Sequence, residues 1–480
     1  MTINRFIFAA LFLVACKSSD PLFCDAEHPC TDPAKPYCDL DGTYPASDGV
    51  AKTCIADPGG GGDCDGDEDC TDPAFPACEA ETCHECRDAT QCTASAPVCD
   101  AGFSCAACTA PADCAAYTDT PVCGASGACV ECDDNAECSG TTPVCNAAGS
   151  CEACTAHDQC DSGICDASTG ACVAEGMIAY VSTTGSGTAC SKATPCDTVQ
   201  KGVDAARPYV LVSAGTYDGS LAIDGTQLVT IVGPATIRPA GIGEVVLTIT
   251  GTARVVLQEI SVTGTSGGAN AIECGGVGGT AGLSVLNGSV TGNSGMGIDA
   301  TDCDLVVDRS TIAQNGGGGI KASTSRFVVR NTFIVSNGLA STFGGIRIDG
   351  PAPAGSVLEF TTMVGNSSSG LAGQTRGVRC ADVASPLTFR GVIIWGDGVQ
   401  VPAAESNCLF DQSNLVSGAS GTNISTEPTY VNAEAGNYHL APGSAGIDMG
   451  GTVGVPAVDF DGEARPQGAA ADIGADEVVP

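Results

Sequence analysis

Residues 289–348 read SVTGNSGMGIDATDCDLVVDRSTIAQNGGGGIKASTSRFVVRNTFIVSNGLASTFGGIRI. Within this stretch Asn293, Asn315 and Asn337 recur every 22 residues, each at the end of an apolar segment, and Asn366 follows after a longer insertion. A period of this length that combines β-branched with turn residues is typical of a solenoid in which each repeat forms one coil of β-structure. We expect the asparagines to stack as a ladder along the turns.

A short strand-like segment follows each turn: NAIEC, MGIDA, GGIKA, GGIRI and RGVRC. Their central aliphatic residues form one column, predicted to point into the core: Ile272, Ile298, Ile320, Ile346 and Val378. Because side chains alternate between the faces of a strand, the next residues should point outward and stack about 4.8 Å apart. This predicted outward row runs from acidic to basic: Glu273, Asp299, Lys321, Arg347 and Arg379. Small residues before the core column predict a smooth track beside it: Ala271, Gly297, Gly319, Gly345 and Gly377.

The chain changes composition near Ile178, where cysteine becomes sparse and Gly, Val, Ile, Ser and Thr dominate. Residues 179–223 contain the strand-like YVS, a short helix predicted around Thr198 to Ala206, and then VLVSAGTY. This opening resembles that of right-handed parallel β-helix proteins of the pectate-lyase-like superfold, in which a short helix caps the first coil. The predicted fold class is therefore all-β, with a parallel β-helix head.

Three functions stay open for the outward row. The preferred one is non-catalytic binding of an extended polymer such as a polysaccharide, or of a partner protein, with Lys321, Arg347 and Arg379 as the binding row. The resemblance to pectate lyases implies an alternative, a calcium-dependent polysaccharide lyase in which Glu273 and Asp299 hold the ion and Lys321 or Arg347 is the base. A purely structural role is the third, in which Asp299 and Lys321 simply pair.

Aromatic residues make up 5% of the chain and all four histidines lie outside the predicted coils of the β-helix, which weakens the enzyme interpretation. Neither a cofactor nor a metal site is expected for a binding protein, and Ca²⁺ enters only with the lyase.

Cysteine spacing divides the first part of the chain into tandem units. Of 31 Cys, 24 lie between Cys24 and Cys172, in groups of four, and six follow between Cys190 and Cys408. The C-x2-C joins between units resemble zinc half-sites, but a long regular array in an exported chain favours disulfides. Units this small need such covalent links to fold.

The pattern C-x5-C-x4-P-V-C from Cys132 through Cys138 to Cys145, with the G-x-C that follows, resembles Dickkopf-N-terminal-like cysteine-rich repeats of exported bacterial proteins, which implies an extended stalk with little regular structure. In the head we predict three bridges: Cys190–Cys196, Cys274–Cys303 and Cys380–Cys408. The last two pairs are separated by about one coil plus a turn, so stacked coils would bring them within reach of a disulfide.

The chain carries a formal net charge of −37. Most of this excess lies in residues 17–176, where 30 acidic residues face four basic ones, a balance of −26. So acidic a segment repels nucleic acid and anionic head groups, and neither is an expected partner.

The N-terminus reads MTINRFIFAALFLVAC, with Arg5 before an apolar run. This is the pattern of a secretory signal peptide, and its end resembles a bacterial lipobox in which Cys16 is lipidated. Acyl chains gain about 0.8 kcal/mol per buried methylene, so they would anchor the protein without a spanning helix. We expect an exported, lipid-anchored protein on the outer membrane or cell surface of a Gram-negative bacterium.

The C-terminal sequences NYHLAPGSAGIDMG and DFDGEARPQGAAADIGADE resemble the terminal motif of choice-of-anchor Q proteins. Four acidic residues match that motif and are expected to bond turns, with an ion site as the alternative: Asp448, Asp459, Asp461 and Asp472. The predicted organisation is a signal peptide (1–15), a lipidated tether (16–23), cysteine-rich repeats (24–176), a parallel β-helix (177–426) and a terminal segment completing it (427–480).

Overall fold

A computed structural model describes part of the chain. The described residues are 30–31, 35, 37–39, 52–55, 64, 66–80, 82–276, 281–339, 343–350, 353–368, 377–381, 387–395, 408–410, 414–416, 424–452 and 454–479. The chain divides into two compact units, Met1–Thr155 with Ala167–Ala171, and Ala156–Asp166 with Cys172–Pro480. The predicted lipidation site Cys16 lies outside the described residues. Within them, no helix has the length and apolar character needed to cross a bilayer.

The cysteine-rich units share one design, a two-stranded antiparallel hairpin held by disulfides. The strand pairs are β1 (Tyr37–Asp39) with β2 (Thr53–Ile55), β3 (Ala77–Glu79) with β4 (Thr82–His84), β5 (Val98–Cys99) with β6 (Cys105–Ala106), β7 (Val122–Cys123) with β8 (Cys129–Val130), β9 (Val144–Cys145) with β10 (Cys151–Glu152), and β11 (Cys165–Asp166) with β12 (Ala171–Cys172). Single 3-10 turns accompany them: η2 (Asp67–Asp69), η3 (Ala89–Gln91), η4 (Pro111–Cys114), η5 (His157–Gln159) and η6 (Glu175–Met177).

In four of these units the first cysteine bonds the third and the second bonds the fourth. The bridges are Cys64–Cys78 and Cys70–Cys83, Cys86–Cys99 and Cys92–Cys105, Cys108–Cys123 and Cys114–Cys129, and Cys132–Cys145 and Cys138–Cys151. This confirms the disulfide interpretation over zinc for these cysteines and supplies a connectivity that spacing alone left open.

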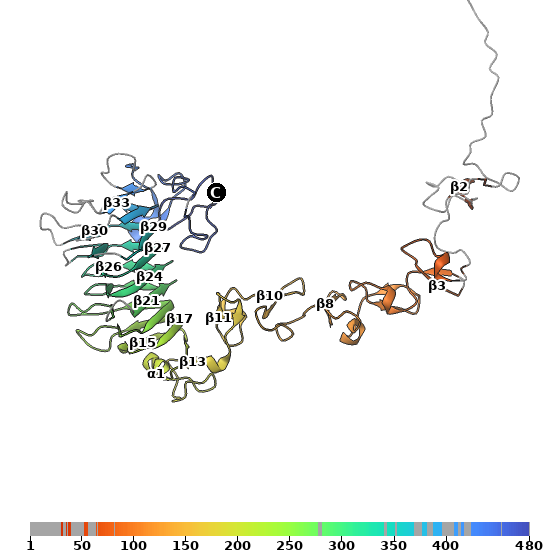
Figure 1. The fold of residues 1–480 in the computed structure, drawn as a ribbon, viewed down its shortest axis with the longest axis horizontal. Helices are drawn as coiled ribbons and strands as arrows, with labels where there is room; N and C mark the ends of the chain where they lie inside the picture. The colour runs from red at the N-terminus through yellow and green to blue at the C-terminus, as the bar shows by residue number, and fades with distance from the viewer. Residues whose placement is uncertain are drawn as a thin grey trace, which may run out of the picture. The chain divides into compact units, whose positions relative to one another are not determined.

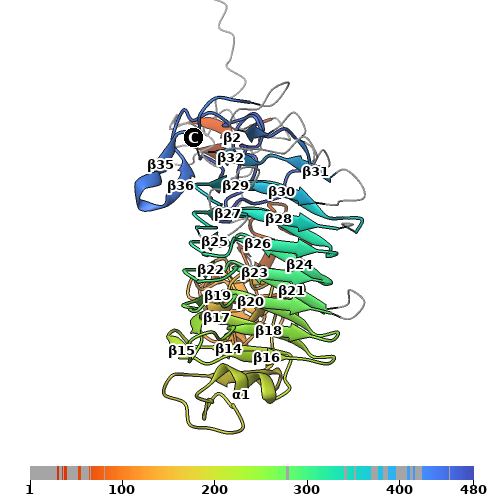
Figure 2. The ribbon, with the colours of Figure 1, turned by 90° about the vertical axis from the view of Figure 1, so that its left-hand side faces the viewer.

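The second unit is a parallel β-helix. Its seven-stranded sheet contains β16 (Leu221–Ile223), β18 (Leu247–Thr250), β20 (Ile272–Gly275), β23 (Ile298–Thr301), β26 (Ile320–Ser323), β28 (Ile346–Asp349) and β30 (Val378–Ala381). Figure 2 shows these strands stacked from α1 (Val199–Asp204) at one end towards β30. Every pair in the sheet is parallel and in register, so the predicted column from Ile272 to Val378 is confirmed.

A 15-stranded sheet forms the other walls of the β-helix. Its main path is β13 (Ile178–Val181), β14 (Tyr209–Val212), β17 (Leu228–Arg238), β19 (Arg254–Thr263), β21 (Ala281–Leu286), β24 (Cys303–Asp308), β27 (Phe327–Val335), β29 (Val357–Val364), β31 (Leu387–Arg390) and β33 (Cys408–Phe410). Beside it lie β15 (Thr216–Asp218), β22 (Ser289–Thr291), β25 (Thr311–Ala313), β32 (Ile393–Trp395) and β34 (Leu415–Val416).

The 15-stranded sheet bends into two walls at one column of left-handed residues. These are Glu259, Asn287, Arg309, Asn331, Phe360 and Gly391, with φ between 45° and 63°. The strands β17, β19, β27 and β29 are long because they run through this bend (Figure 1). From β19 onwards a left-handed residue recurs because the chain turns a corner at the same place in each coil, whereas β17 turns it at Gly233 and Pro234.

Aliphatic residues from all three walls fill the interior, and α1 covers its first coil. Val199 and Val203 of the helix belong to the same core as Ile272 and Ile320. The Thr198 side chain caps the helix by accepting from the Lys201 amide. The predicted capping helix is therefore confirmed, and it shields the open end of the solenoid core.

The asparagine ladder is confirmed inside the turns. Nδ2 of Asn293 donates to Oδ1 of Asn315 (2.9 Å), Asn315 to Asn337 (2.9 Å), and Asn337 to Asn366 (3.0 Å). All four side chains are buried. Buried amides are stable here because each bonds its neighbours and a backbone carbonyl as well.

Part of the last cysteine-rich unit packs on the outside of the β-helix. Ile164 is buried against Tyr180 and Val232, and the Tyr180 hydroxyl donates to the Ser162 carbonyl (3.1 Å). The compact unit containing the β-helix consequently begins within the repeats, at residue 156.

The described C-terminal segment covers an outer wall of the β-helix. It contains β35 (Tyr430–Asn432) paired antiparallel with β36 (Asn437–Leu440), and η7 (Ala433–Ala435) between them. Leu440 and Ile473 are buried against Phe333, Val364 and Ile393 of β27, β29 and β32. The segment thus lies on existing coils, as a separate two-stranded sheet.

Candidate binding face on the seven-stranded sheet

The five residues of the predicted outward row lie in one column, which we name the charged ladder. Glu273, Asp299, Lys321, Arg347 and Arg379 are neighbours in register on β20, β23, β26, β28 and β30. Each is partly exposed while the residues on either side are buried. With strands about 4.8 Å apart, the ladder spans roughly 19 Å.

The three charges in the middle of the ladder, Asp299, Lys321 and Arg347, are paired within the protein. Lys321 Nζ lies 3.1 Å from Asp299 Oδ1 and 3.3 Å from Oδ2, so the alternative that these two residues pair is confirmed. Arg347 bonds Asp349, two positions further on its own strand, with Nε 2.7 Å from Oδ2. Such partly exposed pairs contribute about 0–1 kcal/mol each. Their main effect is to hold the side chains in fixed positions along the face.

Hydrogen bonds also hold the acidic end of the ladder. Asn270 Nδ2 donates to Glu273 Oε1 (3.0 Å), and the Thr301 hydroxyl donates to Asp299 Oδ1 (3.0 Å). Both carboxylates line a hollow of about 300 Å³ together with Thr248, Thr250, Gly275 and Thr301. This arrangement of hydroxyls and carboxylates can accept and donate hydrogen bonds to a polyhydroxylated ligand, or supply oxygen ligands to a cation.

The small residues beside the ladder do not form a surface track, and that prediction was wrong. Gly297, Gly319 and Gly345 are buried. A Cβ on Gly297 would lie 2.7 Å from the Gly319 carbonyl oxygen, and one on Gly319 would lie 2.5 Å from the Gly345 oxygen. The positions are small because adjacent coils approach each other there, next to the asparagine ladder.

Sequence reasoning missed several members of this face. Asp349 and Thr301 occupy the second outward position of their strands, two residues after the ladder, and Thr250 lies in the same column on β18. The signal was available in the period-2 alternation of each segment. The pairing of Asp349 with Arg347 within one strand was not, because it depends on side-chain conformation.

Two of the three bridges predicted for the head are present. Cys190–Cys196 lies beside the capping helix, and Cys274–Cys303 links β20 to β24 beneath the ladder. Cys380 is also disulfide-bonded. The side chain of its predicted partner, Cys408, lies outside the described residues.

Three of the four acidic residues of the C-terminal motif accept backbone amides, as expected, whereas Asp461 pairs with His439, with Oδ2 2.9 Å from Nε2. Asp459 Oδ1 accepts from the amides of Gly462 and Glu463 (2.9 Å each). Asp472 accepts from the amides of Asp448 (2.7 Å) and Val478 (2.8 Å). These carboxylates take the place of backbone partners in a segment with little regular structure.

A buried ion pair lies within the same segment. Arg465 Nε lies 3.3 Å from Glu477 Oε2, with both side chains at most 1% exposed. Burial raises the pKa of Asp472 and Glu477, and it raises the pKa of Asp476 to about 6. The Arg465 guanidinium also lies over the Phe360 ring at 4.8 Å, which ties the segment to the bend of the β-helix.

Comparisons with known proteins add little to this description. Residues 77–178 match a family of unknown function (DUF8331), a match that lies in the cysteine-rich repeats. Among solved structures the chain is similar to pectate lyase Pel9A, with 13% identity, a TM-score of 0.35, and coverage of 62% of this chain and 96% of that chain. A similarity this distant carries no argument, so the fold assignment rests on the strand pairing. No curated protein matches. The resemblances to Dickkopf-like repeats and choice-of-anchor Q proteins stay predictions.

Proposed function

We propose that the β-helix binds an extended acidic polysaccharide along the charged ladder without cleaving it, at a membrane surface to which a lipid on Cys16 anchors the protein. The observation that carries this proposal is the in-register column from Glu273 to Arg379. A polymer repeats its functional groups along one direction, and the ladder repeats charged positions along one direction.

The two ends of the ladder suit different groups of such a polymer. Arg347 and Arg379 lie side by side at the basic end, where guanidinium groups can bind carboxylates in a bidentate manner. The hollow at Glu273 and Asp299 can bond sugar hydroxyls. Because Asp299 and Asp349 already pair with cations, each polymer contact replaces an existing one, and affinity depends on many weak contacts along the row.

Geometry favours binding over lyase chemistry. Lys321 Nζ contacts both oxygens of Asp299, so the candidate base is held by an internal partner and does not stand free to reach a sugar. Arg347 is likewise held by a carboxylate. One observation favours the lyase: Glu273 and Asp299 line the same hollow and offer hard oxygen ligands for Ca²⁺.

The test uses the full chain, exported as a soluble Cys16→Ser variant, with polygalacturonate as the probe. Replacing Lys321, Arg347 and Arg379 with Gln should abolish binding and leave thermal stability nearly unchanged. The matched control replaces Arg238, Arg254 and Arg330 on the other sheet with Gln, the same change in charge, and should bind like the parent. Binding should weaken with added salt, since charges on an open face are screened over about 8 Å at physiological ionic strength.

The outcomes separate the alternatives. A triple ladder variant that binds like the parent refutes the proposal. Release of unsaturated sugars that requires Ca²⁺ and is lost in Glu273→Gln and Asp299→Asn would establish the lyase instead. If the parent binds neither polygalacturonate nor any polymer of a glycan array, the ladder is a structural face.

A further inference from the structure

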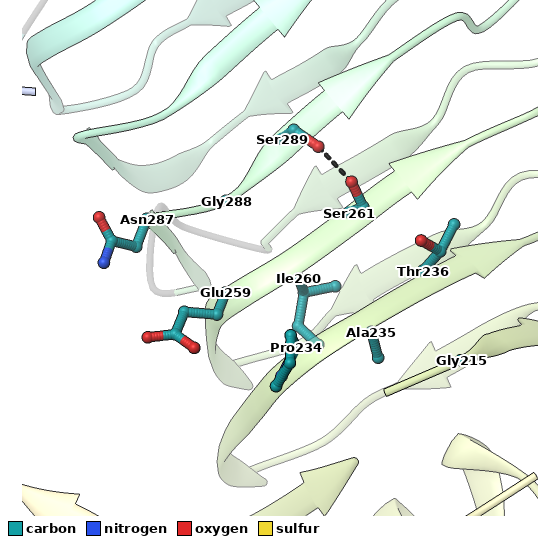
Figure 3. A pocket seen from close by; sticks show the side chains of 10 residues that line it. All are labelled: Gly215, Pro234, Ala235, Thr236, Glu259, Ile260, Ser261, Asn287, Gly288 and Ser289. Atoms are coloured by element: carbon teal, nitrogen blue, oxygen red, sulfur yellow. Dashed lines mark hydrogen bonds between the residues drawn. The ribbon is translucent and has the colours of Figure 1, made fainter. Parts of the chain in front are cut away.

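A second polar face lies on the 15-stranded sheet, after its bend. Outward residues on β15, β17, β19, β22 and β25 align in register, and every one of them carries a hydroxyl: Thr216, Thr236, Ser261, Ser289 and Thr311. The hydroxyls of Ser261 and Ser289 bond each other (Figure 3). We name this row the hydroxyl row.

After Thr311, the residues in the same column contact the C-terminal segment. The next outward positions are Phe333 on β27, Thr362 on β29 and Ile393 on β32. Phe333 and Ile393 pack against that segment, and the Thr362 hydroxyl accepts from the Ala475 amide (2.9 Å). In the described part of the chain the C-terminal segment thus packs on this wall from Ala313 and Phe333 onwards, and the hydroxyl row before it presents groups suited to a polar ligand.

A hollow of about 360 Å³ lies over the first coils of the hydroxyl row. Thr236, Ser261 and Ser289 line it, with Glu259 and Asn287 at the bend (Figure 3). The volume falls at the lower end of the range for small-molecule sites and fits one or two sugar rings.

The bend explains why two polar side chains project at this edge. Glu259 and Asn287 have φ of 57° and 54°, so the backbone turns there and directs both side chains away from the core. Among the residues that the structure describes, none forms a hydrogen bond with the side chain of Glu259 or Asn287. A carboxylate, an amide and three hydroxyls together offer both donors and acceptors to a ligand.

Charge and polarity select the kind of ligand. The residues lining the hollow include Glu259 and no cation, so a polyanion would be repelled. Of its three apolar members Ala235 and Ile260 are buried and only Pro234 is exposed, which leaves no large apolar centre of the kind that protein interfaces use. Sugar hydroxyls match the remaining groups, because each can donate to Glu259 and accept from a serine or threonine.

We infer that this hollow is a second saccharide site, which takes an uncharged sugar unit and acts independently of the charged ladder. The two faces belong to different sheets of the β-helix. A chain that binds acidic polymer on one face and neutral saccharide on the other can link two kinds of surface glycan.

Calorimetric titration of the full soluble chain tests this, with neutral hexasaccharides (cellohexaose, xylohexaose and mannohexaose) and hexagalacturonate as probes. We expect at least one neutral hexasaccharide to bind, with an affinity that does not depend on salt. The double change Ser261→Ala with Ser289→Ala should weaken that binding about tenfold or more, from the loss of two hydrogen-bonding groups. Ser289→Phe, which fills the hollow, should abolish it.

Thr263→Ala with Thr291→Ala is the matched control. These threonines lie on the same strands, β19 and β22, two positions beyond the serines and outside the hollow. Binding by this control should stay within about twofold of the parent, since it removes no lining group. Failure of the parent to bind any of the three neutral probes, or equal weakening by both double variants, would overturn the inference. Hexagalacturonate binding should be lost in the ladder variant and kept in the serine variant, so the two proposals fail separately.

Discussion

Replacing Asn337 with Ala should destabilise the β-helix more than any surface change. The Asn337 side chain is fully buried and makes four hydrogen bonds. Its Oδ1 accepts from the backbone amide (3.1 Å) and the Nδ2 (2.9 Å) of Asn315. Its Nδ2 donates to the Ile312 carbonyl (2.8 Å) and to Asn366 Oδ1 (3.0 Å).

The expected cost follows from these four bonds. A net contribution of about 1 kcal/mol for each gives about 4 kcal/mol, because alanine removes all four bonds from a buried site. For a domain of this size that loss lowers the thermal midpoint by roughly 8 to 16 °C. Asn337→Asp should cost at least as much, since a carboxylate would face two oxygen atoms that now accept hydrogen bonds.

Thermal unfolding followed by the fluorescence of Trp395, the sole tryptophan, measures the midpoint. The control is Asn287→Gly, which removes an exposed amide at a left-handed position that glycine accommodates. Its midpoint should change little. A shift of less than about 2 °C for Asn337→Ala would show that the ladder is not a main source of stability.

Three further predictions concern other parts of the chain. Burial raises the pKa of Asp476 to about 6, above its unfolded value, so the folded state binds its proton more tightly, and the stability this contributes is lost as pH rises through 6. The thermal midpoint should therefore rise as pH falls from about 7 to 5, and less so in Asp476→Asn; an identical slope would contradict this. Replacing Cys274 and Cys303 with Ser opens a loop of 29 residues and should cost about 3.6 kcal/mol, against about 2.2 kcal/mol for the six-residue loop of Cys190 and Cys196. The reverse order of midpoints would argue against this account. Cys16→Ser should release the protein from membranes in cell fractionation, and continued membrane association of an exported variant would exclude the lipid anchor.

The charged ladder could be predicted because it depends on local periodicity. Ile298 is buried and Asp299 is partly exposed, as alternation within a strand requires, and the recurrence of the same short segment in each coil sets the register although the connecting loops differ in length. The predicted surface track of small residues was wrong because local periodicity does not decide whether these residues are exposed. Gly297 and Gly319 precede the strand, and the close approach of adjacent turns buries them.

Which partner each charged residue of the ladder contacts could be learned only from the structure. Sequence alternation places Lys321 beside both Asp299 and Arg347, but it does not say which neighbour the ammonium contacts. The structure gives the pair Lys321–Asp299 and turns Arg347 towards Asp349 on its own strand. Both choices depend on side-chain rotamers, which the residue pattern does not encode.

The sequence alone determined the coil, its core column, the buried asparagine ladder and the disulfide chemistry of the repeats, because each depends on spacing within or between adjacent repeats. Only the tertiary structure decided which outer faces the C-terminal segment covers. Ala475 bonds Thr362 across 113 residues, and Phe333 packs beneath a segment that begins about a hundred positions later. A contact so distant in sequence leaves no periodic signal, so the boundary between the covered wall and the hydroxyl row is set by packing.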